Sequence, residues 1–121
     1  MAQLEVDTHD VPSTDPAKPA AVVVTAAGEA VVDLEPLVSL LQTVGARRPP
    51  AVVIDLSRLT FMSSLAMGVI LAFRRNVLAH GGKVRVACVQ PLVLDSFRRA
   101  RLDKVFDLVE SLDLALAGLA K

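Results

Sequence analysis

The sequence predicts an α/β domain built around a mostly parallel sheet. Short β-branched runs alternate with longer segments in which Leu, Val and Ala recur at helical spacing. Gly and Pro stand at most of the boundaries between these segments. The resulting order is strand, strand, helix, strand, helix, strand, helix, strand, helix. We therefore expect right-handed crossovers, roughly four to five strands and about four flanking helices, with some antiparallel pairing at the N-terminus.

The chain divides into a short N-terminal segment and one domain. Its 121 residues suffice for a single hydrophobic core. Residues 1–19 form a strand/linker segment, in which Leu4–Asp7 predicts a short edge strand. Residues 8–20 hold three of the seven prolines, which is typical of a linker or an exposed loop. The domain itself is expected over residues 20–121.

The first half of this domain should contain two strands and a helix. The β-branched run Ala20–Ala27 predicts a strand that Gly28 closes with a turn. A helix should follow from Asp33, its N-cap, to about Gly45. Its apolar face comprises Leu34, Leu37, Val38, Leu41 and Val44. The run Ala51–Asp55 is apolar without alternation, which predicts a strand buried on both faces and ending at Asp55.

The second half should contain three helices and two strands. After a pair of serines, apolar residues at helical spacing predict a helix that stops at Gly81–Gly82. The remaining elements follow in order: a strand over Lys83–Val89, a helix from Pro91 to about Ala100, a strand over Phe106–Val109, and a helix capped by Ser111 that runs to about Ala120.

Composition argues against several classes of partner. Thirteen basic and thirteen acidic residues cancel, so no overall field favours nucleic acid or an anionic membrane. No apolar run reaches the length that membrane insertion needs, which is about 18 residues. The N-terminus lacks the basic and apolar regions of a signal peptide. We expect a cytoplasmic protein.

The sequence offers no catalytic or metal centre. His9 and His80 lie far apart, and neither has a ligand-spaced Asp, Glu or Cys. No glycine-rich nucleotide motif and no nucleophile elbow occurs. Cys88 stands alone in an apolar run, where core packing is its expected role. We therefore expect no enzyme activity, no catalytic residue, no metal and no cofactor.

Two polar features remain without an assigned role. Asp55 resembles a receiver-domain phosphoacceptor only in position, because the acidic pair that would hold magnesium is missing; we expect it to be structural. Ser63 and Ser64 begin a helix, and one hydroxyl suffices for an N-cap. The other is either redundant or a modification site, since a helix start suits a phosphate. Composition alone favours capping over modification.

One ordered set of residues resembles a known family. The stretch from Val52 to about Ala117 resembles the STAS family of anti-sigma factor antagonists, and the similarity covers about residues 20–118. The matching positions are Asp55, Leu56, Ser57, Phe61, Met62, Ser64, Met67 and Gly68, followed by Gly81–Gly82, the helix opened by Pro91, and Leu102–Phe106. The resemblance implies a STAS-like fold, a mostly parallel sheet flanked by helices.

The family's mechanism is partner switching, which the resemblance carries to this chain. The unmodified protein would bind a serine kinase of the histidine-kinase-like ATPase type that is also an anti-sigma factor. This binding frees the sigma factor. Phosphorylation of the matching serine, Ser64, would end the complex, and a serine phosphatase would restore it. Ser63, which stands where the family usually has Asp, is the alternative acceptor.

The same resemblance implies a contact surface around the serines. Its expected members are Phe61, Met62, Ser63, Ser64, Leu65, Met67, Arg74 and Arg75, with Asp55 and Gly68 as structural residues. Leu65 and Ala66 replace the small hydroxyl and the glycine that the family usually has there. The alternative function is a STAS subunit that is never phosphorylated, in a phospholipid-transport ABC complex or a signalling scaffold.

Overall fold

The computed structural model of the chain describes residues 3–12, 20–31, 33–87 and 90–117. Cys88, which the sequence assigns to the core, lies outside these residues. Within them the elements are, in chain order, β1 (Glu5–Val11), β2 (Ala21–Ala30), α1 (Glu35–Ala46), β3 (Ala51–Met62), α2 (Ser64–Ala79), β4 (Lys83–Ala87), α3 (Pro91–Arg99), β5 (Asp107–Val109) and α4 (Leu112–Ala117).

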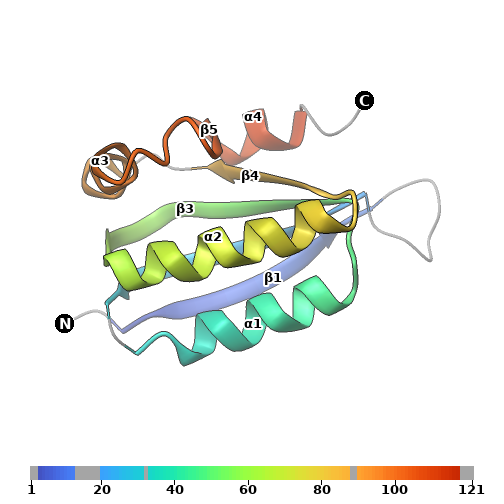
Figure 1. Cartoon of the computed structure of the whole chain (residues 1–121), viewed down its shortest axis with the longest axis horizontal. Helices are drawn as coiled ribbons and strands as arrows, with labels where there is room; N and C mark the ends of the chain where they lie inside the picture. The colour runs from blue at the N-terminus through green and yellow to red at the C-terminus, as the bar shows by residue number, and fades with distance from the viewer. Residues whose placement is uncertain (1–2, 13–19, 32, 88–89, 118–121) are drawn as a thin grey trace.

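The strands form one five-stranded sheet in the order β1-β2-β3-β4-β5. Only β1 and β2 pair antiparallel, and the other neighbours pair parallel (Figure 1). One row of paired residues crosses the whole sheet: Asp7, Thr25, Asp55, Ala87 and Val109. The predicted α/β class, the mostly parallel sheet and the antiparallel pair at the N-terminus are confirmed.

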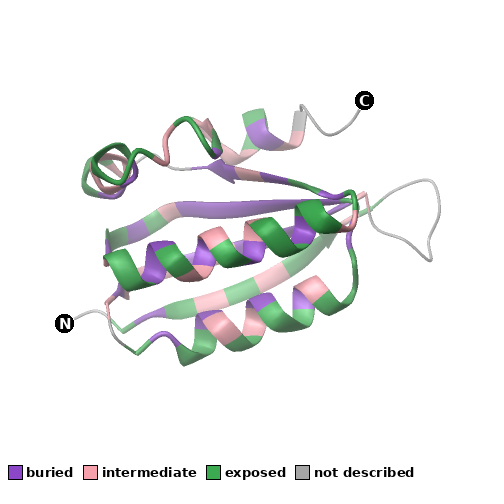
Figure 2. Cartoon of the chain, in the orientation of Figure 1, coloured by how far each residue is buried: buried purple, intermediate pink, exposed green. Residues whose placement is uncertain are grey.

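The inner strands are buried on both faces, as their continuous apolar runs predict. Alternate residues of β2 and β3, such as Val24 and Ile54, join the core that includes α1 and α2, whereas Val23 and Val53 pack with α4. Figure 1 shows α1 and α2 side by side over one face of the sheet. In Figure 2 the first half of β3 is buried, while β1 is exposed or half-buried.

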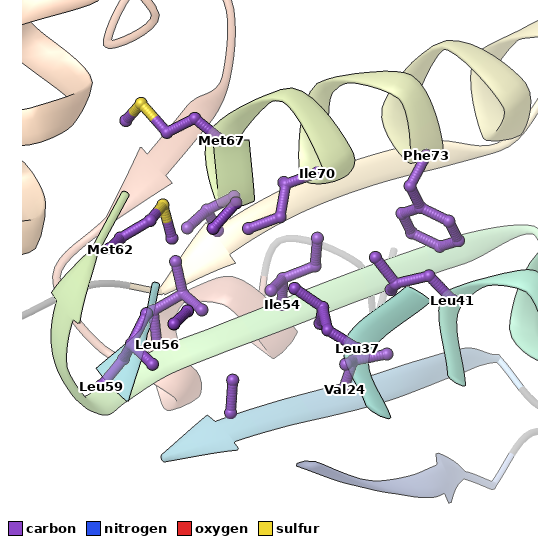
Figure 3. Packing of buried hydrophobic residues seen from close by; sticks show 14 of the residues in the cluster. Val24, Leu37, Leu41, Ile54, Leu56, Leu59, Met62, Met67, Ile70 and Phe73 are labelled. Carbon is purple, nitrogen blue, oxygen red and sulfur yellow. The ribbon is translucent and has the colours of Figure 1, made fainter. Parts of the chain in front are cut away.

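The main core lies between the sheet and these two helices (Figure 3). Leu37 and Leu41 of α1 meet Ile70 and Phe73 of α2 above Ile54 of β3. A further part of the core is aromatic. The rings of Phe97 on α3 and Phe106 lie 5.5 Å apart between centroids at 81°, an edge-to-face arrangement that fixes the segment leading into β5 against α3.

The N-terminal strand is longer than the sequence predicts. It runs from Glu5 to Val11 and not only to Asp7, so the first residues assigned to a linker are strand. Its polar side chains misled the prediction, because β1 is an edge strand with only one neighbour in the sheet. Backbone pairing with β2 over seven residues makes this segment a strand, although its side chains do not indicate one.

Gly28 does not end β2 in a turn. The strand continues to Ala30, with register shifts against β3 at Thr25/Ala27 and Gly28/Glu29. Gly28 has a φ of 91°, a conformation that glycine adopts without steric cost. A Cβ at this position would overlap the carbonyl oxygen of Gln3. The glycine therefore marks a bulge where the chain preceding β1 approaches closely.

Two other boundaries differ from expectation. The strand that should end at Asp55 continues to Met62, because the second half of β3 pairs with the bulged end of β2. Helix α1 begins at Glu35 with Leu34 as N-cap and no side-chain cap, so Asp33 does not cap it. Ser111 does cap α4, since its Oγ accepts a hydrogen bond of 3.2 Å from the Leu114 N–H.

Candidate functional site

The two serines lie where β3 passes directly into α2. Strand β3 ends at Met62 and helix α2 begins at Ser64, which leaves Ser63 as the only connecting residue. The backbone N–H of Ser63 donates a 2.8 Å hydrogen bond to the carbonyl oxygen of Ala30, the last residue of β2. The start of α2 is thereby held at the carboxyl edge of the two central parallel strands.

Ser63 is the N-cap of α2. Its backbone is extended, with φ −81° and ψ 166°, and its Oγ accepts a 3.2 Å hydrogen bond from the Ala66 N–H. The same hydroxyl donates a 2.6 Å hydrogen bond to the carbonyl oxygen of Val31. The Ser63 hydroxyl thus donates one bond and accepts another, and the side chain is half-buried.

Ser64 occupies the first position of the helix and is exposed. Within the described part of the chain its hydroxyl makes no hydrogen bond. The first turn of α2 contains no acidic residue, so nothing there neutralises the positive end of the helix dipole. Ser64 therefore presents a free hydroxyl beside backbone N–H groups that favour a negative charge.

Two apolar side chains flank the serines on the surface. Phe61, the penultimate residue of β3, is 44% exposed, and Leu65 on the first turn of α2 is 60% exposed. We call Phe61, Ser64 and Leu65 the switch surface. Met62 and Met67 do not belong to it, contrary to the sequence prediction. Both are buried, at 3% and 5% exposure, and pack in the main core (Figure 3).

Both the sequence and the fold of this chain match known proteins. A sequence model described as the STAS domain matches residues 18–115. This chain belongs to the STAS domain family. Comparison with curated proteins found no match.

Solved structures similar to this STAS domain include an anti-sigma factor antagonist, a cell fate determinant and a sulfate transporter family protein. An anti-sigma factor antagonist from Mycobacterium paratuberculosis is 27% identical with a TM-score of 0.80, over 97% of this chain and 96% of that one. The phosphorylated form of the Bacillus cell fate determinant SpoIIAA is 19% identical with a TM-score of 0.65, over 98% of this chain and 99% of that one. A sulfate transporter family protein from Wolinella succinogenes is 15% identical, TM-score 0.69, over 92% and 96%. The last two show the fold alone.

The two arginines predicted for the contact surface lie farther along α2 of the STAS domain. Arg74 follows Ser64 by ten residues, which is about 15 Å along a helix axis. Its guanidinium carbon lies 5.7 Å from the centroid of the Phe106 ring, a cation–π contact within the chain. Arg75 is exposed. Neither arginine therefore adjoins the switch surface directly.

Asp55 has local partners in the STAS domain. It is 9% exposed, and its Oδ1 accepts hydrogen bonds from the Ser57 N–H at 3.0 Å and the Ser57 hydroxyl at 2.6 Å. The carbonyl oxygen of Ser57 in turn accepts a 2.9 Å hydrogen bond from Gln90 Nε2. The bond from Gln90, the N-cap of α3, links this part of β3 to the start of that helix.

Gly68 has no packing reason inside the STAS domain to be glycine. It is exposed on α2, one turn after Ser64, and a Cβ there would meet no atom within 4 Å. The structural role that the sequence assigns to Gly68 is therefore not explained by contacts of the described residues. Because Gly68 has no side chain, the backbone of α2 is accessible next to the switch surface.

The described residues contain neither a metal-binding cluster nor a membrane-spanning helix. No group of three or more His, Cys, Asp or Glu side chains is arranged to hold a metal ion among residues 3–12, 20–31, 33–87 and 90–117. No helix in those same ranges combines the length and hydrophobicity needed to cross a bilayer. The sequence did not reveal the roles of Ala30 and Val31 at this site, because both act through their backbone carbonyls and leave no side-chain signal.

Proposed function

We propose that this STAS domain is an anti-sigma factor antagonist that works by partner switching in the cytoplasm. The observation that carries the proposal is the division of labour between two adjacent serines. Ser63 is engaged as the cap of α2, and Ser64 is exposed with a free hydroxyl. The 27% identical antagonist from Mycobacterium paratuberculosis, aligned over nearly the whole chain, supports this function.

In the unmodified state, the switch surface would bind the anti-sigma factor. Phe61 and Leu65 supply exposed apolar area on both sides of Ser64, and apolar anchors of this kind dominate the affinity of many interfaces. Gly68 lets a partner side chain approach the backbone of α2. The partner is a serine kinase of the histidine-kinase-like ATPase type, which then releases its sigma factor.

Phosphorylation at Ser64 would then end the complex. The Ser64 Oγ attacks the γ-phosphorus of the kinase's bound ATP, its proton leaves, and ADP is the leaving group. The product carries about two negative charges. The free N–H groups and the dipole of α2 stabilise these charges in the isolated domain, whereas burial against the partner would desolvate them. Binding is therefore lost without unfolding, and a serine phosphatase restores it.

Ser63 is the poorer acceptor. Transfer to its hydroxyl would break the bond to Val31 and disturb the bond from Ala66, at a cost of about 1 kcal/mol for each bond. A phosphate on Ser63 would also need room beside a half-buried side chain. Ser64 requires neither change.

The test is intact-mass spectrometry with site mapping on protein purified from its own cells, before and after phosphatase treatment. We expect one phosphatase-sensitive phosphate on Ser64. The mark should vanish in Ser64→Ala and persist in the matched variant Ser63→Ala. A phosphate on Ser63 would keep the switch and move the acceptor. No phosphate under several growth conditions would contradict the proposal and favour a static STAS subunit of a transport complex or a signalling scaffold.

A further inference from the structure

A groove runs between α1 and α2 and continues to the ends of both helices. Its volume is about 650 Å³, which lies in the range typical of small-molecule sites. The helices run side by side over the sheet (Figure 1). The groove is lined by Val38, Leu41, Gln42, Gly45, Ala46, Arg48, Val69, Ala72, Phe73, Asn76 and His80.

The lining is divided along the helices. Val38, Val69 and Phe73 supply apolar lining ahead of the helix ends, and Figure 3 shows the Phe73 ring directed toward Leu41 on α1. Arg48 follows the end of α1. The polar residues thus gather where both helices end, and a ligand would need an apolar body with one polar end.

The polar end carries one formal positive charge. The Arg48 side chain is exposed and makes no hydrogen bond or ion pair with the described residues. His80 lines the same end, and its Nε2 is covered from solvent without a hydrogen-bond partner in the described part of the chain. A buried nitrogen of this kind loses its hydration without compensation. An acceptor oxygen entering here would relieve that cost.

The carbonyl ends of the two helices do not reverse this preference. The N–H of Arg47 bonds the Val44 carbonyl, and that of Arg48 bonds the Gly45 carbonyl. In α2, the N–H groups of His80 and Gly82 both bond the Val77 carbonyl. These bonds occupy three carbonyl oxygens, those of Val44, Gly45 and Val77, and so reduce the repulsion of an anion at the helix ends. The guanidinium then sets the sign of the charge that the groove prefers.

We propose that the groove binds a small amphipathic carboxylate, its apolar chain between α1 and α2 and its carboxylate at Arg48 and His80. The groove lies beyond the proposed switch along α2, because its lining begins at Val69, one turn after Leu65. The charge of Arg48 selects a carboxylate over the corresponding alcohol or amine. The apolar walls select a chain over a compact anion such as acetate.

Sodium octanoate is the probe, titrated below its micellar range into the ¹⁵N-labelled full chain and followed by NMR. We expect saturable shifts that concentrate at groove residues and leave Ser63 and Ser64 unmoved. Octan-1-ol and octylamine should bind at least about tenfold more weakly. Chemical shift changes that fail to saturate, or that are largest outside the groove, would contradict the proposed binding site. Equal binding of octan-1-ol would overturn the carboxylate preference.

Two variants, each with a matched control, test the residues. Arg48→Glu should weaken octanoate binding at least about tenfold, whereas Arg101→Glu should change it by less than about twofold. Both arginines are exposed with positive φ, 50° and 59°, so charge and backbone strain change equally. Ala72→Trp should fill the groove and abolish binding, and Ala79→Trp, exposed on α2 outside the lining, should not.

Two outcomes would overturn the proposal regardless of folding effects. Equal loss in Arg48→Glu and Arg101→Glu would show that binding is not located at the groove. Groove resonances that shift with protein concentration in the absence of octanoate would show that a second copy of the chain occupies it. Neither result depends on phosphorylation, so failure here leaves the switch proposal unaffected.

Discussion

The hydroxyl of Ser63 lies 2.6 Å from the carbonyl oxygen of Val31, to which it donates a hydrogen bond. This contact joins the start of α2 to the residue that follows β2, and the backbone N–H of Ser63 adds a second link through Ala30. The Ser63 side chain and backbone therefore have a structural role at the start of α2. Ser64, one residue later, makes no such side-chain hydrogen bond with any described residue.

Ser63→Ala should destabilise the domain far more than Ser64→Ala. Loss of the cap and of the bond to Val31 should lower the free energy of unfolding by about 1–2 kcal/mol. Ser64→Ala removes an exposed hydroxyl and should change it by no more than about 0.5 kcal/mol. Urea unfolding of both variants measures the difference. Equal losses would show that the two serines share the capping role.

Ser64→Asp should remove binding to the ATPase-type anti-sigma factor while leaving the far-UV dichroism unchanged. The carboxylate is favoured at the helix start but unfavourable against an apolar partner surface. The measurement is calorimetry with each purified anti-sigma kinase of this type from the same organism. Ser64→Ala is the control and should bind the same partner as wild type does. Retained affinity in Ser64→Asp would rule out a charge-based switch.

Leu65→Ala and Met67→Ala should affect different properties although they are two residues apart. Leu65 is 60% exposed and Met67 is 5% exposed. Leu65→Ala should weaken partner binding about tenfold with little change in stability. Met67→Ala should lower the free energy of unfolding by about 2–5 kcal/mol. The control is Leu114→Ala, 55% exposed on α4, which should change neither; partner binding that is insensitive to Leu65 would move the interface elsewhere.

Gly68→Ala should stabilise the isolated domain. A Cβ at this exposed position in α2 meets nothing within 4 Å, and alanine in a helix interior is favoured over glycine by about 1 kcal/mol. Thermal unfolding followed by dichroism measures the gain. The same variant should weaken partner binding, because the added methyl group enters the space beside the switch surface. A stabilised variant with unchanged partner affinity would remove Gly68 from the proposed interface.

Gly28→Ala should be more destabilising than Gly81→Ala. Both glycines have similar positive φ values, 91° and 86°, so each variant carries about 1–2 kcal/mol of backbone strain. Only at Gly28 would the new methyl group also collide with the Gln3 carbonyl, whereas nothing lies within 4 Å at Gly81. The difference between their urea midpoints measures the close approach alone. Equal midpoints would mean that the chain before β1 moves aside without cost.

The periodic segments of the chain allowed a largely correct prediction of the fold. The runs that became β3 and β4, the helix start at Pro91 and the cap at Ser111 carry strong local signals. The errors fall where pairing overrides local preference. β1 looks like a polar linker until β2 supplies its hydrogen bonds, and Gly28 resembles a turn because a bulge needs the same backbone freedom.

The site was less predictable than the fold. The serine pair could be located from the sequence, but which hydroxyl caps α2 depends on the position of the Val31 carbonyl, a distant backbone atom. Met62 and Met67 lie within the same short stretch as the exposed Phe61 and Leu65. Which of these side chains point into the core depends on the orientation of β3 and α2, which the sequence does not give. Arg74 could not be placed without knowing that Phe106 lies beneath it.

The order of strands in the sheet follows the order in the chain. Each new strand is added beside the one synthesised just before it, so no strand has to insert between two that are already paired. During translation the nascent polypeptide can therefore assemble outward from β1, with α1 and α2 packing on β2 and β3 before α3, β5 and α4 emerge from the ribosome. The short β5 then pairs with the exposed edge of β4, and α4 packs beside both strands, so the strand left at the margin of the sheet is a very short one.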